Sequence, residues 1–195
     1  SAEILNEVTM MPDKSIPTDL LSKCAGVAIF PYVLKGGFFV GARYGKGIVI
    51  AHDANSGKWK APAFFTIGGG SFGFQIGAQA TDLILVIINK RGLEGLLQDK
   101  FTLGADAEVA AGPVGRNASA DTDLLMKAGI FSYSRTKGIF AGVSVEGAVL
   151  IPDKDANHSY YNADITTEEI IFGDKATVPA SAQKLLQALT KASGK

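Results

Sequence analysis

The chain has 195 residues, of which 47% are hydrophobic and 19% are charged, so it is too apolar and too weakly charged for an intrinsically disordered protein. Its 19 basic and 19 acidic residues cancel, which excludes the broad positive field of a nucleic-acid-binding protein. No apolar run approaches the roughly 20 residues of a membrane-spanning helix, and the single cysteine, Cys24, excludes an intrachain disulfide and a cysteine zinc site.

Helical patterns mark both ends of the chain. Residues 2–11 carry the apolar stripe of an amphipathic helix, and Thr18 or Asp19 can cap a second, shorter helix. Three further helices are expected towards the C-terminus, at residues 153–161, 167–172 and 181–192.

Strand patterns occupy the region between these helices. Residues 27–33 form an apolar strand, and two-residue alternation on either side of Tyr44–Gly47 predicts a hairpin whose turn is that segment. Asp53–Gly57 supplies the residues of a second turn. The remaining strands are expected at residues 71–79, 83–89, 103–112, 129–135 and 138–151, with a short helix at 91–98.

The glycine content indicates how these strands are arranged. Most of the 23 glycines lie inside strand-like segments, which favours close strand crossings, bulges and strong curvature. No repeat or long linker divides the chain. The sequence therefore predicts one α+β domain over residues 1–195, a strongly curved, glycine-rich antiparallel sheet or small barrel flanked by N- and C-terminal helices.

The residues needed for catalysis are scarce. Gly68–Ser71 resembles a phosphate-binding loop, but no Lys-Ser or Lys-Thr pair follows and the next residues alternate as in a strand, so a structural bend is favoured. The two histidines, His52 and His158, are expected at exposed positions, and Cys24 is expected to be a small core residue. We therefore predict a protein that is not an enzyme and has no cofactor.

Acidic residues could serve in two other ways. Asp106 and Glu108 share one face of a predicted strand, where they could do acid/base work, but an ion-pair network with Arg116 or Arg135 is favoured. The run from Asp153 to Asn157 has the carboxylate spacing that opens a calcium loop, but its sixth position is His158 instead of glycine. A capped helix start explains the same residues, so no metal site is predicted.

Basic residues gather near the predicted hairpin ends. Turns hold such side chains at the rim of a sheet, where several could converge on one phosphate headgroup, although they could equally serve solubility alone. The candidate lipid-binding residues are Lys35, Arg43, Lys46, Arg116, Arg135 and Lys137.

Several glycine-punctuated motifs carry a family resemblance. They include Gly41–Gly47 (GARYGKG), Ala110–Asn117 (AAGPVGRN), Ser132–Arg135 (SYSR) and Gly138–Val143 (GIFAGV). In these motifs and their order, the chain resembles the SYLF family over nearly its whole length. The resemblance implies a non-enzymatic module that binds phosphoinositide-type lipids in eukaryotic adaptors of endocytosis and cortical actin, sometimes binding actin itself.

The resemblance also bears on location. Bacterial SYLF relatives resemble exported or lipid-anchored envelope proteins, and the run Ala63–Ser71 is more similar to that branch, which implies a periplasmic or cell-envelope protein. One departure is that the first predicted helix carries Glu3 and Glu7 and no basic residue, whereas eukaryotic members bind lipid through a basic N-terminal segment.

Two functions follow as hypotheses. The first is a module that binds anionic phospholipid or phosphoinositide-type headgroups at a membrane surface through the basic rim. The second is a structural or protein-interaction module of the envelope, actin-binding-like, that shows a contiguous exposed apolar patch and no response to lipid. Under both hypotheses, nucleic acid is not expected as a partner.

Overall fold

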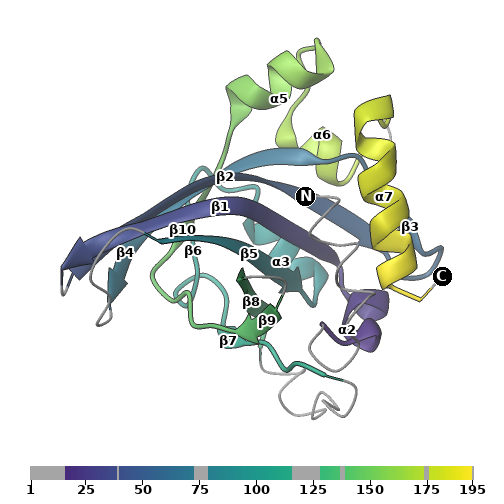
Figure 1. The fold of residues 1–195 in the computed structure, drawn as a ribbon. Helices are drawn as coiled ribbons and strands as arrows, with labels where there is room; N and C mark the ends of the chain where they lie inside the picture. The colour runs from purple at the N-terminus through teal and green to yellow at the C-terminus, as the bar shows by residue number, and fades with distance from the viewer. Residues whose placement is uncertain are drawn as a thin grey trace.

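A curved, mixed β-sheet forms the body of the molecule (Figure 1). The computed structural model describes residues 16–38, 40–72, 79–115, 128–136, 139–173 and 176–194. The strands are β1 Gly26–Phe38, β2 Val40–Asp53, β3 Lys58–Trp59, β4 Ala63–Phe72, β5 Gln79–Ile87, β6 Phe101–Thr102, β7 Val109–Ala111, β8 Ile130–Thr136, β9 Ile139–Gly142 and β10 Val149–Pro152. Their order is β6-β10-β4-β2-β1-β5-β8-β7, with β3 beside β2 and β9 beside β8. Strand pairs are antiparallel except for β7 with β8, and the predicted α+β class is confirmed.

Short helices flank the sheet. They are α2 Thr18–Lys23, α3 Lys90–Gly95, α5 Lys154–Tyr161, α6 Thr167–Ile171 and α7 Ala180–Ala192. They cover both faces of the sheet: α3 and α6 pack in one apolar core, whereas α2 and α7 pack in the other. The three predicted C-terminal helices are confirmed. The predicted helix over residues 2–11 lies outside the described residues, and α2 follows Pro17 without the side-chain cap expected from Thr18 or Asp19.

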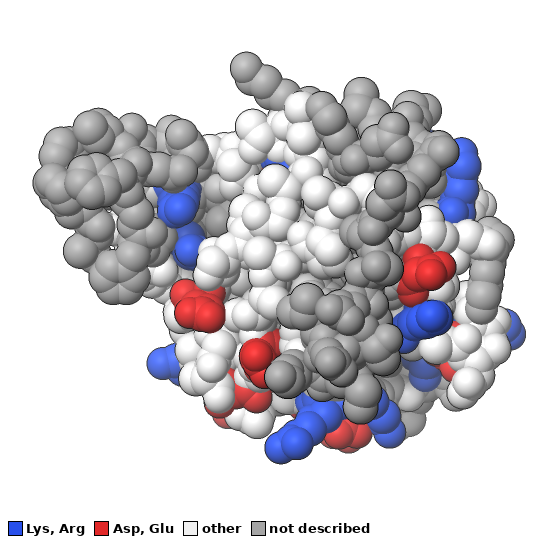
Figure 2. Space-filling model, turned by 90° about the horizontal axis from the view of Figure 1, so that it is seen from below, with Lys and Arg blue, Asp and Glu red and all other residues white. Residues whose placement is uncertain are grey.

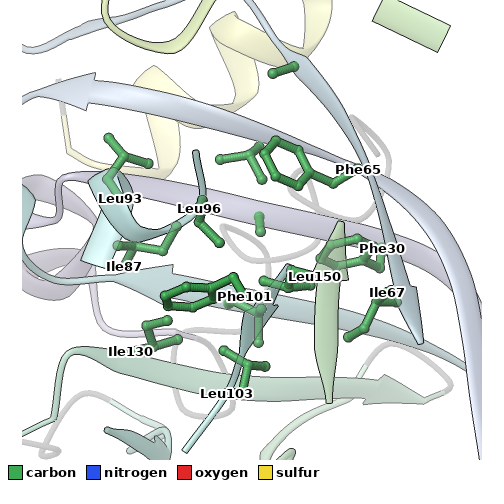
Figure 3. Close-up of a cluster of buried hydrophobic side chains, with 14 of the residues drawn as sticks. Phe30, Phe65, Ile67, Ile87, Leu93, Leu96, Phe101, Leu103, Ile130 and Leu150 are labelled. Atoms are coloured by element: carbon green, nitrogen blue, oxygen red, sulfur yellow. The ribbon is translucent and has the colours of Figure 1, made fainter. Parts of the chain in front are cut away.

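Both faces of the sheet carry an apolar core. On the face we call inner, Phe30 and Phe65 from the long strands pack with Phe101 and Leu150 (Figure 3). On the face we call outer, residues such as Ile50 join the apolar stripe of α7. Each large side chain buried here contributes about 1.5–3 kcal/mol to stability. Two covered faces explain why the central strand β5 is apolar at both parities, as predicted.

The first hairpin is longer than predicted. The turn expected at Tyr44–Gly47 is wrong, because these residues lie inside β2, which pairs with β1 along nearly its whole length. Their glycines serve close packing: a Cβ on Gly47 would overlap the Ile29 carbonyl oxygen and the Phe30 ring, and one on Gly45 would lie 3.0 Å from the Val33 side chain. The second predicted turn, at Asp53–Gly57, is confirmed.

Two predicted strands are interrupted. Residues 103–112 contain a turn, in which Gly104 has a φ of 89° and Asp106 accepts a 2.6 Å hydrogen bond from the Thr102 N–H, so only β7 remains of that strand. Residues 138–151 divide into β9, which pairs with β8 as expected, and β10, which crosses to β4. Gly68–Gly70, expected in a bend, lie within β4. The predicted strand 71–79 contributes its ends to β4 and β5, and residues 73–78 lie outside the described residues.

The close contact between β1 and β2 at Gly47 can be tested by adding one methyl group. We expect Gly47→Ala to lower the free energy of unfolding by about 1–3 kcal/mol, because the new Cβ would overlap Ile29 and Phe30 of β1. Urea denaturation measures the loss. Gly36→Ala in β1 is the matched control, because its Cβ would meet nothing within 4 Å. Equal stability of the two variants would show that this contact does not require glycine.

Candidate anion-binding site

A one-residue bulge in β1 determines which side chains reach each face of the sheet. The pairing of β1 with β2 and with β5 shifts by one position near Tyr32, which has a left-handed φ of 55°. A bulge inserts one unpaired residue and reverses the alternation that follows it. Phe30 before the bulge and Val33 after it therefore both face the inner core, and Lys35 follows Val33 onto that face.

An ion pair on the outer face supports this bulge. The Tyr32 N–H donates to Asp82 Oδ1 at 3.1 Å, and Arg135 Nη1 donates to Asp82 Oδ2 at 3.0 Å. The Arg135 and Asp82 side chains are only 14% and 17% exposed, and the two residues are register partners on β8 and β5. The carboxylate of Asp82 therefore satisfies both a backbone group freed by the bulge and a partly buried guanidinium.

A cavity of about 130 Å³ opens on the inner face beyond the bulge, and we call it the Arg43 cavity. Lys35 and Arg43 lie directly opposite each other on β1 and β2 at its edge. The segment 143–145 after β9 forms its far wall, and Ser144 is exposed there, so the cavity reaches solvent. Its lining residues are Val33, Lys35, Arg43, Thr81, Leu83, Ser134, Val143, Ser144 and Val145.

The charges at this cavity are not balanced. Among the described residues, none that lines the cavity is acidic, and neither Lys35 nor Arg43 has an ion-pair partner. Like charges directly opposite each other on two strands are unfavourable, by on the order of 0.2–1 kcal/mol. Arg43 Nε is also buried without a hydrogen-bond partner, and burial lowers the pKa of this guanidinium below its usual value. The cavity therefore holds two uncompensated cations and an unsatisfied donor, a combination that an anion would relieve.

Hydroxyl groups complete the lining, and these residues were not predicted. Thr81, Ser134 and Ser144 line the cavity, and none of the three hydroxyls hydrogen-bonds to another residue in the described ranges. By contrast, the nearby Ser132 hydroxyl donates to the Ala110 carbonyl oxygen at 3.2 Å. The alternation of Ser132–Arg135 could have predicted that Ser134 and Arg135 lie on opposite faces of their strand. The position of Ser134 beside β5, however, depends on a register that the sequence does not specify.

The other predicted site residues lie elsewhere. Lys46 pairs with Asp153 at 3.1 Å and is 66% exposed, and Arg135 lies on the outer face with Asp82. Arg116 and Lys137 lie outside the described residues. The structure thus brings Lys35 and Arg43 together at one cavity and separates Lys46 and Arg135 from them.

The possible calcium loop is the start of a helix. Asp153 caps α5 by accepting a 3.0 Å hydrogen bond from the Ala156 N–H. Although burial alone would raise its pKa, this hydrogen bond and the ion pair with Lys46 hold the pKa of Asp153 below its usual value. Asn157 accepts from the Phe64 N–H at 2.7 Å, so its side chain links α5 to β4. The capped-helix interpretation is confirmed, and among the described residues no cluster of metal ligands forms.

Of the two histidines and the cysteine, His52 and Cys24 are buried and His158 is exposed. Contrary to expectation, His52 is buried: its Nδ1 donates to the Cys24 carbonyl oxygen at 3.0 Å and its ring stacks on Trp59 at 4.2 Å. His158 is exposed, as predicted. Cys24 is buried in the outer core, as predicted, and burial raises the pKa of its thiol to about 12, so it remains an unreactive thiol.

An exposed apolar patch lies on the outer face of the same strand pair. Leu34 and Tyr44 are register partners and are 57% and 53% exposed, and Tyr32 at the bulge is 76% exposed. We call these three residues the Tyr32 patch. It occupies the face opposite the Arg43 cavity, because Leu34 and Tyr44 directly adjoin Lys35 and Arg43 along their strands.

In the residues described, no helix has the length and apolarity to cross a bilayer.

Comparisons with known proteins agree with this fold and these motifs. Residues 68–192 match the family model described as "Ysc84: Las17-binding protein actin regulator". The chain is 40% identical over 195 residues to the human "SH3 domain-containing YSC84-like protein 1", covering 97% of this chain and 56% of that protein. It is 34% identical over 180 residues to "Protein YSC84" of Saccharomyces cerevisiae, covering 91% of this chain and 38% of the yeast protein.

These relatives bear on the expected branch of the family. The two relatives above are an animal and a fungal protein. A further fungal relative is a Schizosaccharomyces pombe SH3 domain-containing protein that is 39% identical over 184 residues. They lend no support to the bacterial, envelope-type branch expected from Ala63–Ser71. The chain spans about half the length of the curated relatives it matches, covering 56% of the human protein and 42% of the S. pombe protein.

The support of the bulge by Asp82 can be tested with two substitutions. We expect Asp82→Ala to lower the free energy of unfolding by about 2–3 kcal/mol, because it removes the acceptor of the Tyr32 N–H and the carboxylate that pairs with the partly buried Arg135. Asp82→Asn keeps an acceptor for Tyr32 and should cost less. Urea denaturation compares the two variants. Equal losses would mean that the backbone hydrogen bond contributes nothing to holding the bulge.

Proposed function

The chain belongs to the Ysc84 family of SYLF domains, which are non-catalytic binding modules, and we propose that it binds anionic phospholipid headgroups at a membrane surface. Eukaryotic domains of this family bind lipids and actin. The observation that supports lipid binding here is the pair of cations at the Arg43 cavity. Lys35 and Arg43 face each other with no carboxylate beside them in the described residues, and an anionic headgroup would supply the missing charge.

This proposal requires a local group of positive charges, because the net charge of the whole chain is zero. Figure 2 shows basic and acidic side chains interspersed around one face instead of forming a single basic field. Attraction would therefore act at short range, within a Debye length of about 10 Å at 0.1 M salt. Binding should be sensitive to salt and should depend on a few residues instead of on net charge.

The shape of the β1–β2 arm suits a membrane interface. In Figure 1 the end of the strand pair that carries Lys35 and Arg43 lies away from α7, and β4 pairs with β2 up to this end. One face of the arm carries Lys35 and Arg43, and the other carries the Tyr32 patch. Tyrosine is favoured at membrane interfaces because its ring is apolar and its hydroxyl is polar. The arm thus combines cations for headgroups with exposed apolar surface for the boundary of the acyl chains.

Vesicle binding tests the proposal. We expect wild type to sediment with phosphatidylcholine vesicles that contain phosphatidylserine, and not with phosphatidylcholine alone. Removing both cations, in Lys35→Ala/Arg43→Ala, should weaken binding roughly 30-fold, since each basic residue near an anionic surface contributes about 1 kcal/mol. The matched control, Lys58→Ala/Lys184→Ala, removes the same charge from exposed sites elsewhere and should bind nearly as wild type does.

Two further results bear on this proposal. Lys46→Ala should have a smaller effect than Lys35→Ala, because Asp153 already neutralises Lys46. The proposal fails if the cavity variant and the matched control bind equally well, or if wild type does not bind anionic vesicles at low salt.

The envelope location expected from the sequence stays a prediction.

A second candidate function is binding of actin, for which the Tyr32 patch is the supporting observation. A contiguous exposed apolar patch is what a protein-interaction module requires, and three neighbouring large side chains form one here. The matching family is described as an actin regulator, which makes filamentous actin the partner to test.

The two functions should respond to different substitutions. We expect Leu34→Ser/Tyr44→Ser to reduce co-sedimentation with filamentous actin about tenfold, because aromatic and apolar anchors dominate protein interfaces. Ile151→Ser is the control, because Ile151 is 45% exposed but lies on β10, away from the patch. Unchanged actin binding by the double variant, or equal loss in the control, would exclude the patch as the actin-binding surface.

A further inference from the structure

We propose that the Arg43 cavity binds a single phosphomonoester group, with Arg43 and Lys35 as its cationic partners and the hydroxyls of Thr81, Ser134 and Ser144 as further donors. This inference rests on the proposed function and deepens it, because it names the chemical group that the anion site selects. The group could belong to a lipid headgroup or to a soluble phosphate ester. Both present the same terminal phosphate to the cavity.

The donors at the cavity match a dianion with three free oxygens. Lys35 supplies one charge, and the guanidinium of Arg43 supplies a second with a planar set of N–H donors that suits two oxygens of one phosphate. Arg43 Nε is already buried without a partner, so binding costs little further desolvation at that atom. The hydroxyls of Thr81 and Ser134, which have no hydrogen-bond partner among the described residues, can donate to the remaining oxygen.

The lining argues against a phosphodiester as the preferred group. A monoester carries a charge of about −1.5 to −2 at pH 7 and three acceptor oxygens, whereas a diester carries one charge and two free oxygens. With a diester, one of the two opposed cations would remain uncompensated. The described lining residues include no carboxylate that could take that role.

The size of the cavity suits one such group. A single water needs on the order of 10–15 Å³ of such space, and the cavity offers about 130 Å³, enough for a phosphate and its first attached atoms. Its remaining wall is apolar, formed by Val33, Leu83, Val143 and Val145. Charge-assisted hydrogen bonds are stronger beside such an apolar wall than in water.

Solution NMR on the whole chain tests the site with soluble probes. Glycerol 3-phosphate and inorganic phosphate are the monoester and free-phosphate probes, and dimethyl phosphate is the diester. We expect the Arg43 Nε–H signal to move downfield with the first two and hardly at all with the third. Arg43→Lys keeps the charge but loses the planar donors, and Ser134→Ala removes one hydroxyl. Each should weaken monoester binding, the former about tenfold or more.

Vesicles test whether lipid presents the group. Phosphatidylcholine vesicles containing phosphatidic acid, a monoester, are compared with vesicles containing phosphatidylglycerol, a diester, adjusted to equal surface potential. We expect wild type and the Lys58→Ala/Lys184→Ala control to prefer phosphatidic acid at least fivefold, and Arg43→Lys to lose the preference while it keeps general binding to anionic vesicles. The preference should grow from pH 5 to pH 7, as the second phosphate ionisation near pH 6 is completed.

The outcomes separate this inference from the proposed function. Equal binding to both vesicle types, with no response of Arg43 to soluble phosphate, overturns the monoester site and leaves headgroup binding in place. A response to glycerol 3-phosphate without vesicle binding supports the site and overturns the membrane proposal. No response to either kind of probe overturns both. A preference that survives Arg43→Lys in a folded protein, as judged by its thermal unfolding, also overturns the site.

Discussion

The arrangement of this molecule depends on one irregularity, the extra residue in β1 near Tyr32. Without the bulge, Lys35 would face the outer side of the sheet and Leu34 the inner side, because alternation along a strand has a period of two. With it, Lys35 meets Arg43 and the Tyr32 patch is exposed on the opposite face. The bulge is in turn maintained by Asp82, which joins the freed N–H of Tyr32 to Arg135 on β8. Arg135, which was predicted to bind the ligand, thus holds Asp82 in the place where it supports the bulge.

Strand curvature is the second condition, and glycine provides it. β1 and β2 lie so close together at Gly47 that a Cβ there would overlap the Phe30 ring. Gly69 in β4, with a φ of 125°, lies against the backbone of Gly147. The segment after β9, residues 143–145, lies against this curved sheet and lines the Arg43 cavity. Substitution of such glycines would alter the cavity as well as the stability.

The sequence predicts the elements of this fold better than their connections. Helices and buried strands follow from apolar periodicity, and α3, α5, α6, α7 and β5 appear where it places them. The predicted hairpin turn was misplaced because Tyr44–Gly47 has the composition of a turn. In the structure its glycines leave space for side chains on β1, which are distant in the sequence. At the site, Lys35 and Arg43 could be named from their positions near strand ends. Thr81, Ser134 and Ser144 could not, because a strand register decides which hydroxyls share a face, and the bulge changes that register.

Ion pairing distinguishes structural cations from those available to a ligand. Arg135 and Lys46 are each held by a carboxylate, Asp82 and Asp153, that also accepts a backbone hydrogen bond. These carboxylates are committed to the fold, and so are the cations beside them. Lys35 and Arg43 have no such partner within the described ranges, although the chain as a whole has as many acidic as basic residues. In a chain of zero net charge, two cations left opposite each other at a cavity lower the stability of the empty protein. An anion that restores the balance there recovers that free energy, so its binding and the stability of the β1–β2 arm are linked.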